Sequence, residues 1–156
     1  GFAVVSTDFS DVGLEYNRRK LPQELEGKVL IQRVDIAEPL PFDDAVFDVV
    51  YSHLGLHYFD SKTTEEIFDE IYRILKSGGI LAILVNSTND PEYGSGIKLE
   101  DEFYEVEGTH KRYFSLDSLR RFAGKFQEMV ADNQGETYKD RAKGTEHLLR
   151  FVGKKV

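Results

Sequence analysis

A run of six apolar residues, Ile80–Val85, constrains the fold more than any other feature of this sequence. It follows a segment, residues 61–79, in which apolar side chains recur at helical spacing, namely Ile67, Ile71, Ile74 and Leu75. A second apolar strand is predicted before that helix, at Phe47–Ser52. Strands that are apolar without alternation are typically covered on both faces. Strand, helix and strand in this order predict an α/β fold with a mostly parallel, Rossmann-like sheet flanked by helices.

Local signals predict where this helix begins and ends. Thr63 and Glu66 have the spacing of a capping box, which places the start of the helix at Thr63. Gly78 predicts the end of the helix, because glycine readily takes the left-handed conformation that closes a helix.

The rest of the chain is predicted to add elements of the same fold. Strands are expected at residues 1–8, 28–34, 126–132 and 146–154, and we expect the last strand to be antiparallel. Helices are expected at about 11–21 and at 115–123, the second capped by Ser115. Because 156 residues suit one domain, we expect a single domain over residues 1–156.

Residues 86–114 differ from the rest because they are polar, acidic and interrupted by Pro91, Gly94 and Gly96. We expect a long loop here, with room for a short strand. Loops of this length within a compact domain are often lids or binding loops. A lid or substrate loop is therefore one expectation for this segment, and a disordered acidic surface loop is the other.

Composition limits the classes of function. The net charge of −8 repels phosphate backbones and disfavours a nucleic-acid partner. The absence of cysteine excludes disulfides and thiolate metal sites, and no ligand pattern suggests another metal site. The absence of cysteine also fits a reducing compartment, so we expect a cytoplasmic protein. No apolar run approaches the roughly 20 residues of a membrane span. A small-molecule partner is therefore expected.

Two strands in succession end at an aspartate. Asp8 ends the strand of residues 1–8, and Asp35 directly follows the strand of residues 28–34. In open α/β sheets ligands bind beyond the carboxyl ends of the strands, so both carboxylates are predicted to face a ligand crevice. An aspartate at such a place also forms Asx turns and helix N-caps, and that alternative stays open for each residue.

Three stretches of the chain resemble the class I S-adenosylmethionine-dependent methyltransferases. They are VVSTD at residues 4–8, RVDIAEPLPFDDAVFDVVYSHLGLHYF at 33–59 and ILKSGGILAILV at 74–85. The motifs YSHLGLHYF, NDPEYGSG and HKRYFSLDSL narrow the resemblance to small bacterial-type enzymes of that class. The resemblance covers nearly the whole chain, and it implies S-adenosylmethionine as the cofactor.

The resemblance also implies roles for the residues at the strand ends. Asp8 would accept hydrogen bonds from the two ribose hydroxyls of the cofactor, since a carboxylate has two acceptor oxygens. Asp35 would accept from the adenine amino group, and the backbone N–H of Ile36 would donate to a ring nitrogen. Phe9 and Ile36 would contact the adenine ring. The methionine end would be lined by three residues of the next strand end: Ser52, His53 and Leu54.

The sequence departs from that class at its start. Members of the class begin with a strand that enters a glycine-rich loop, whereas Gly1, Gly13 and Gly27 are isolated here. We therefore expect an N-terminally truncated form of a longer enzyme. A sheet that is rearranged, or completed by pairing with another chain, as in a homo-oligomer, is the alternative.

Five polar or aromatic residues are candidates for binding the methyl acceptor: His57, Tyr93, His110, Arg112 and Tyr113. The methyl donor is already activated, so the protein mainly has to position the acceptor in line. A general base is needed only where the acceptor must lose a proton, and no catalytic residue is assigned. Structural explanations also exist: a core histidine for His57, a surface patch for His110 and Arg112, and loop packing for Tyr93.

The predicted function is S-adenosylmethionine-dependent methyl transfer to a small-molecule acceptor. The main alternative is a non-catalytic methyltransferase-like domain that acts through protein partners, and cofactor binding separates the two. A nucleotide-sugar or dinucleotide enzyme of Rossmann type is a further alternative. An RNA-modifying enzyme is another, and it requires affinity that falls steeply with salt.

Overall fold

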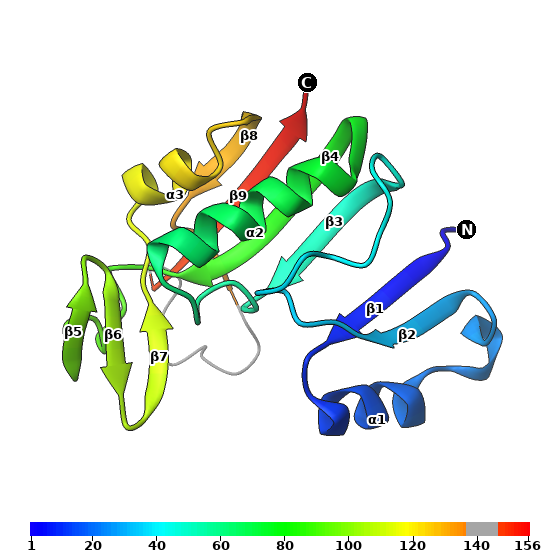
Figure 1. The fold of residues 1–156 in the computed structure, drawn as a ribbon, viewed down its shortest axis with the longest axis horizontal. Coiled ribbons are helices and arrows are strands. Elements are labelled where there is room, and N and C mark those ends of the chain that lie inside the picture. The colour runs from blue at the N-terminus through cyan, green and yellow to red at the C-terminus, as the bar shows by residue number, and fades with distance from the viewer. Residues whose placement is uncertain (137–146) are drawn as a thin grey trace. The chain divides into compact units, whose positions relative to one another are not determined.

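The computed structural model describes residues 1–136 and 147–156 (Figure 1). The chain divides into two compact units, Gly1–Pro41 and Phe42–Val156. The first unit holds a two-stranded sheet, and the second holds a four-stranded and a three-stranded sheet. Among the described residues, no helix is both long and apolar enough to cross a lipid bilayer.

The first unit is a parallel strand pair connected through a helix. Its elements are, in chain order, β1 (Val4–Asp8), α1 (Asp11–Lys20), the 3₁₀ turn η1 (Gln23–Leu25) and β2 (Val29–Arg33). The register of the pair places Asp8 opposite Arg33. The hydroxyl of Ser10 accepts a hydrogen bond from the N–H of Gly13 and so caps α1. The predicted strand–helix–strand order of this unit is confirmed.

The second unit is built on a four-stranded sheet with the strand order β3-β4-β9-β8. Its strands are β3 (Phe47–His53), β4 (Leu75–Asn86), β8 (Phe126–Asp132) and β9 (Leu148–Lys155). β3 and β4 are parallel, whereas β9 runs antiparallel to both β4 and β8. The predicted α/β class and the antiparallel last strand are therefore confirmed.

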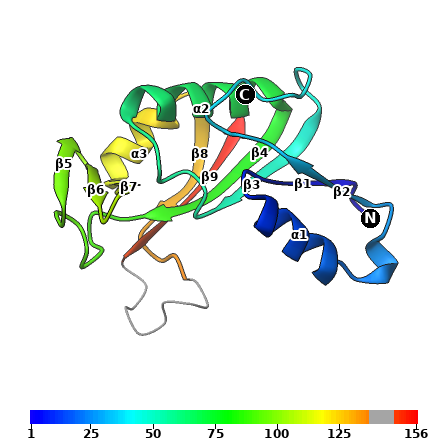
Figure 2. The same cartoon turned by 60° about the horizontal axis from the view of Figure 1, so that its bottom comes forward.

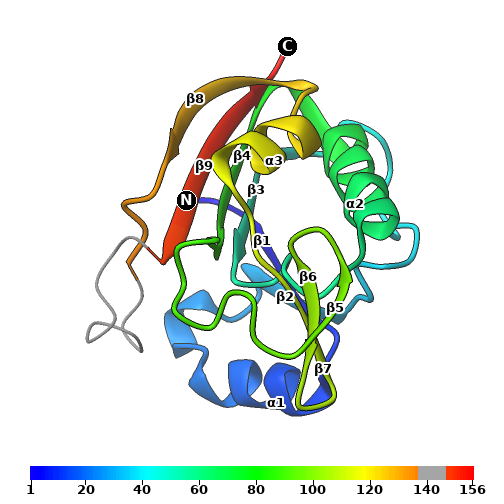
Figure 3. The same ribbon diagram turned by 90° about the vertical axis from the view of Figure 1, so that its left-hand side faces the viewer.

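The two helices described in residues 42–136 and 147–156 lie on one face of the four-stranded sheet (Figures 2 and 3). They are α2 (Ser61–Ile74) and α3 (Leu116–Phe122). The rings of Phe68 and Phe122 stack between them, with 6.1 Å between centroids. The apolar stripe predicted for α2 is buried, with no side chain more than 3% exposed: Ile67, Ile71, Ile74 and Leu75. Burying each such side chain contributes about 1.5–3 kcal/mol, so this stripe holds α2 on the sheet.

The face of this sheet that points away from α2 and α3 is more exposed to solvent than the apolar strands predicted. Register places Tyr51 of β3 beside Ala82 of β4, and Ala82 beside Val152 of β9. Val49 and Tyr51 are 53% and 68% exposed on that face. The coverage on both faces that the apolar run Ile80–Val85 predicted for β4 therefore does not extend to β3 among the described residues. An apolar run indicates which side chains can be buried, and the packed elements decide which ones are.

Residues 86–114 contain a three-stranded antiparallel sheet where a long loop was predicted. The strands are β5 (Ile97–Glu100), β6 (Phe103–Val106) and β7 (Thr109–Arg112). Left-handed residues make the two turns, with φ of 61° at Glu102 and 77° at Gly108. Four-residue strands rich in charged side chains lack the apolar run from which strands are recognised. The role of this sheet as a lid stays a prediction.

α2 begins and ends at other residues than those predicted. Its N-cap is Asp60, whose carboxylate accepts the N–H of Thr63 at 2.7 Å, so the capping box at Thr63 and Glu66 is wrong. The helix ends at Ile74, and Gly78 lies within β4 with a φ of 79°. The ionised carboxylate of Asp60 is a stronger hydrogen-bond acceptor than the hydroxyl of Thr63, and its negative charge also interacts favourably with the helix dipole.

Asp60→Ala is expected to lower the free energy of unfolding by about 1 kcal/mol, the usual cost of losing an N-cap. Asp60→Asn is the matched control, because asparagine caps helices equally well.

The hydrogen bond from the N–H of Thr63 is the main cause that lowers the pKa of Asp60. The charged cap therefore contributes fully above the ordinary carboxyl pKa and is lost as the pH falls through the lowered one. Denaturant titrations at pH 7 measure both variants, and wild-type stability of Asp60→Ala contradicts the assignment.

Candidate functional site

The two aspartates predicted at a ligand crevice lie at the carboxyl ends of β1 and β2. One oxygen of Asp8 accepts the N–H of Ser10 at 2.8 Å, and one oxygen of Asp35 accepts the N–H of Ala37 at 3.0 Å. Both residues thus form the Asx turns that the sequence left open. The second oxygen of each carboxylate accepts no hydrogen bond from the described residues, so each side chain retains one acceptor for a ligand.

Gly13 supports this arrangement and was missed in the sequence. A Cβ atom at this position would lie only 2.6 Å from Oδ2 of Asp8. The glycine therefore lets the first turn of α1 approach the carboxylate closely. The available signal was a single glycine inside a predicted helix, where glycine costs about 1 kcal/mol relative to alanine and often has a packing or functional reason.

The residues predicted for the methionine end, Ser52, His53 and Leu54, lie at the carboxyl end of β3. Leu54 has a φ of 56°, which is uncommon for a residue other than glycine. Its N–H donates to the carbonyl of Leu84 at 3.0 Å, so the left-handed turn stays attached to β4. Such backbone conformations cluster at ligand sites, and this one marks the end of β3 as a candidate site.

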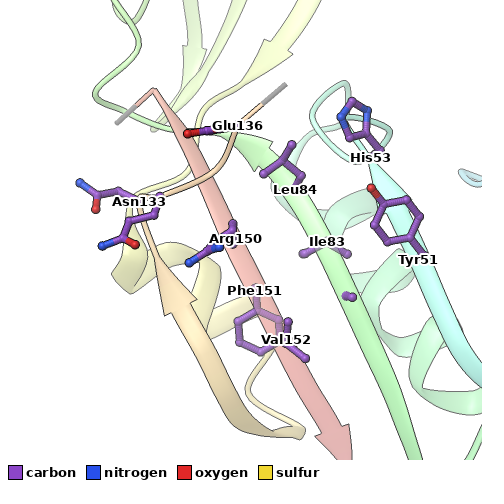
Figure 4. Close-up of a pocket in the computed structure, with 11 residues that line it drawn as sticks. Tyr51, His53, Ile83, Leu84, Asn133, Glu136, Arg150, Phe151 and Val152 are labelled. Carbon is purple, nitrogen blue, oxygen red and sulfur yellow. The ribbon is translucent and has the colours of Figure 1, made fainter. Parts of the chain in front are cut away.

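Tyr51 and His53 line an open hollow of about 780 Å³ on the sheet face away from α2 (Figure 4). Both side chains project from β3, and Arg150 and Val152 project from β9 across the hollow. The guanidinium of Arg150 is paired with Asp132 at 2.7 Å. The hollow therefore combines an apolar floor with polar groups, and Arg150, the arginine that lines it among the described residues, is already paired with a carboxylate.

Arg112 is buried, whereas the sequence offered a surface patch as its structural explanation. Its side chain is 1% exposed. Its Nε donates to the carbonyl of Phe59 at 2.8 Å, and its Nη2 donates to the carboxylate of Glu100. Burial lowers the pKa of Arg112, and the charge of Glu100 opposes that shift. The guanidinium is thus occupied by groups of the protein itself.

Tyr93, Tyr104 and Tyr113 form an aromatic cluster with 5.5–6.1 Å between ring centroids. Tyr93 is 39% exposed, whereas Tyr113 is fully buried and its hydroxyl has no hydrogen-bond partner among the described residues. Burial, followed by the charge of Asp90, raises the pKa of Tyr113 to about 12. The cluster therefore encloses a neutral hydroxyl group. Tyr104 was missed because it lies in the segment predicted as a loop.

His57 and His110 occupy different environments. His57 is 6% exposed, and its Nδ1 has no hydrogen-bond partner among the described residues. Burial, with a smaller effect of Lys111, lowers the pKa of His57 to about 4, so the ring is neutral at pH 7. The side chain of His110 is 53% exposed and lies 3.9 Å from the carboxylate of Glu105. These two candidates for binding the methyl acceptor therefore differ in exposure, because His57 is buried and His110 lies at the surface.

His57 is expected to titrate near pH 4 in the folded protein, against an ordinary value of 6.5. The unfolded chain takes up this proton at the higher pH, so stability is complete above pH 6.5 and falls as the pH drops toward 4. The loss reaches up to about 3 kcal/mol. Imidazole signals in an NMR titration measure the pKa directly, and His57→Gln identifies the signal.

His57→Gln should flatten the stability profile between pH 6.5 and pH 4. A His57 signal that titrates near pH 6.5 contradicts the burial of this ring.

Parallel strands that end at acceptor side chains are the architecture of Rossmann-like nucleotide-binding proteins. Within that class, the methyltransferase domain family matches residues 1–83, more than half of the chain. The chain belongs to this family, and the resemblance found in the sequence is thereby confirmed.

The curated relatives are matched over part of their length. An uncharacterized methyltransferase of Synechocystis sp. is 32% identical over 84 residues, which cover 54% of this chain and 37% of the relative. A ubiquinone/menaquinone biosynthesis C-methyltransferase of Enterobacter sp. is 33% identical over 139 residues, which cover 87% of this chain and 46% of the relative. The chain thus spans less than half the length of these two relatives.

Solved structures share the fold. A SAM-dependent methyltransferase of Methanosarcina mazei has a TM-score of 0.81 at 18% identity, over 100% of this chain and 83% of that chain. An S-adenosylmethionine-dependent methyltransferase of Mesorhizobium loti has a TM-score of 0.73 at 14% identity, over 97% and 79% of the two chains. These similarities confirm the Rossmann-like α/β fold.

Proposed function

We propose that this protein is an S-adenosylmethionine-dependent methyltransferase that acts on a small-molecule acceptor. The observation that carries the proposal is the family match over residues 1–83, the part of the chain that contains Asp8 and Asp35. Relatives named demethylmenaquinone methyltransferase and ubiquinone/menaquinone C-methyltransferase support a small-molecule acceptor. The net charge of −8 agrees with a partner other than nucleic acid.

The first unit offers groups that fit the adenosine part of this cofactor. The N–H of Val34 donates to the carbonyl of Asp8 at 3.1 Å, so Asp35 follows directly beside the end of β1. The open oxygen of Asp8 suits a ribose hydroxyl, and that of Asp35 suits the adenine amino group. Phe9 is 59% exposed, and the guanidinium of Arg33 lies 5.0 Å from the centroid of its ring. An adenine ring would therefore meet an aromatic side chain that is already held in place.

The second unit supplies the groups proposed for the methionine end and for the acceptor. Ser52, His53 and Leu54 are assigned to the methionine end. His57, Tyr93, His110 and Tyr113 are assigned to the acceptor, with Tyr93 and His110 at the surface and the other two buried. The transferred methyl group is activated by the cofactor itself, so these side chains mainly position the acceptor and exclude water.

Asp35→Ala is expected to weaken the binding of S-adenosylhomocysteine by about 1.5–3 kcal/mol, the usual contribution of a hydrogen bond to a charged group. This corresponds to a dissociation constant about 10- to 150-fold higher. Calorimetric titration of the wild-type chain and the variant measures the change. The product is the suitable probe, because it needs no acceptor.

Asp43→Ala is the matched control for that titration, since Asp43 is an exposed aspartate of the turn after β2 that is assigned no ligand. It should bind the product like the wild type. Equal affinity of the wild type and Asp35→Ala contradicts the adenine assignment. A folded wild-type chain that binds no product contradicts cofactor binding by this chain, and it favours either a non-catalytic domain or the truncated form of a longer enzyme that the sequence leads us to expect.

A further inference from the structure

Arg112 contacts three separate segments of the second unit through its N–H groups. Nε donates to the carbonyl of Phe59 at 2.8 Å, in the segment between β3 and α2. Nη2 donates to Oγ of Ser61 at 3.2 Å, at the start of α2. Nη1 reaches the carbonyl of Asp101 at 3.4 Å, in the turn after β5. The backbone N–H of Arg112 also donates to the carbonyl of His57 at 2.8 Å.

Glu100 completes this set of contacts from the end of β5. Its carboxylate accepts a hydrogen bond from the guanidinium of Arg112 and another from the N–H of Ser61, the latter at 2.6 Å. Ser61 is the first residue of α2, so its N–H has no partner within the helix. The dipole of α2 further favours a negative charge at this end. One carboxylate therefore joins β5, α2 and the buried guanidinium.

Aromatic rings seal the guanidinium from water. Its central carbon lies 5.1 Å from the ring centroid of Phe103 on β6 and 5.6 Å from that of Phe122 on α3. Arg112 is 1% exposed, so these contacts operate in a desolvated environment, where hydrogen bonds and charge pairs are stronger than in water. The result is a connection among β5, β6, β7, α2, α3 and the segment between β3 and α2.

The connected segments carry the side chains to which the proposed function assigns ligands. The segment after β3 begins with Leu54 and contains His57. The β5–β7 sheet contains His110, and Tyr113 directly follows it. We propose that Arg112, together with Glu100, is a positioning residue that holds the segment after β3 and the β5–β7 sheet at a fixed separation. The inference rests on the proposed function for its part in methyl transfer, whereas the connection itself is testable without it.

The chemistry of arginine explains why this residue type is suited to the position. A guanidinium offers five N–H donors in a fixed planar arrangement, so one side chain can bind several acceptors on different segments. A lysine ammonium is a compact charge that cannot reproduce these directions. Buried ion pairs are weak evidence for added stability, since desolvation offsets much of their attraction. A role in fixing the geometry accounts better for a buried pair with this many partners.

The first test uses NMR to measure amide hydrogen exchange in the whole chain, and it compares the wild type with Arg112→Met. Exchange at Ser61 and at position 112 is expected to accelerate at least 10-fold more than exchange at Leu81 and Phe151, which lie in the β4–β9 pairing. Arg120→Met is the matched control, because Arg120 forms an exposed pair with Glu128 at 2.8 Å in the same unit. It should leave exchange at Ser61 unchanged. Acceleration that is equal at all four positions, or absent, overturns the proposal.

The second test is the affinity for S-adenosylhomocysteine under conditions in which each variant is fully folded. A purely stabilising residue would leave this affinity unchanged in folded molecules, whereas Arg112→Met is expected to raise the dissociation constant at least 5-fold. Arg112→Lys should recover little of the loss, because it restores the charge without the planar donors. Glu100→Gln serves where Arg112→Met fails to fold, with the same local pattern of exchange expected.

The two proposals fail in different ways. A wild-type chain without product binding contradicts cofactor binding by this chain, while the exchange comparison still decides the role of Arg112. Unchanged local exchange in Arg112→Met and in Glu100→Gln overturns the positioning role, while product binding by the wild type still supports the cofactor.

Discussion

The second unit depends on the way in which a buried guanidinium is satisfied. Removing an unpaired charge from water costs several kcal/mol, so Arg112 can be buried only where acceptors surround it. The carbonyls of Phe59 and Asp101, together with the Glu100 carboxylate, supply them. Each acceptor lies on a backbone segment that must then keep its place. The demand for acceptors thus fixes the segment after β3, the start of α2 and the β5–β7 sheet together, independently of the apolar core between α2 and the four-stranded sheet.

Under the proposed function, each of two carboxylates in the first unit combines a structural role with a ligand-binding one. An Asx turn uses a single oxygen, as in Asp8 with Ser10 and in Asp35 with Ala37. The same hydrogen bond fixes the side chain, so that the other oxygen is held in one direction before a ligand arrives. Preorganisation of this kind reduces the entropy that binding must offset. Gly13, which gives the Asp8 carboxylate its space, belongs to the same arrangement.

Those parts of the fold that follow from apolar periodicity could be predicted from the sequence. The stripe of α2, the run Ile80–Val85 and the order of the strands rest on many side chains at once, so tertiary contacts do not override them. The ends of α2 could not be placed, because Asp60 and Thr63 are both good caps and only the local geometry selects one. The β5–β7 strands could not be found, because their pairing partners, and not their own composition, make them strands.

Arg112 shows why the candidate site was harder to predict than the fold. In the sequence His110, Lys111 and Arg112 form a short basic run, which is typical of a solvated face. On a strand, however, successive side chains point to opposite faces. Lys111 therefore reaches Glu92 at 2.7 Å, whereas Arg112 enters the interior on the other side. A charge run predicts exposure only when the residues are known not to alternate.

Two of the buried polar groups in the second unit share a property that bears on methyl transfer. His57, whose pKa is about 4, and Tyr113, whose pKa is about 12, both stay neutral across the pH range between those values. Under the proposed function the donor is a sulfonium, whose positive charge disappears when the methyl group leaves. A fixed anion beside it would stabilise the charged reactant more than the dispersed charge of the transition state, and so would slow the transfer. Neutral groups such as these can orient an acceptor through hydrogen bonds without that penalty.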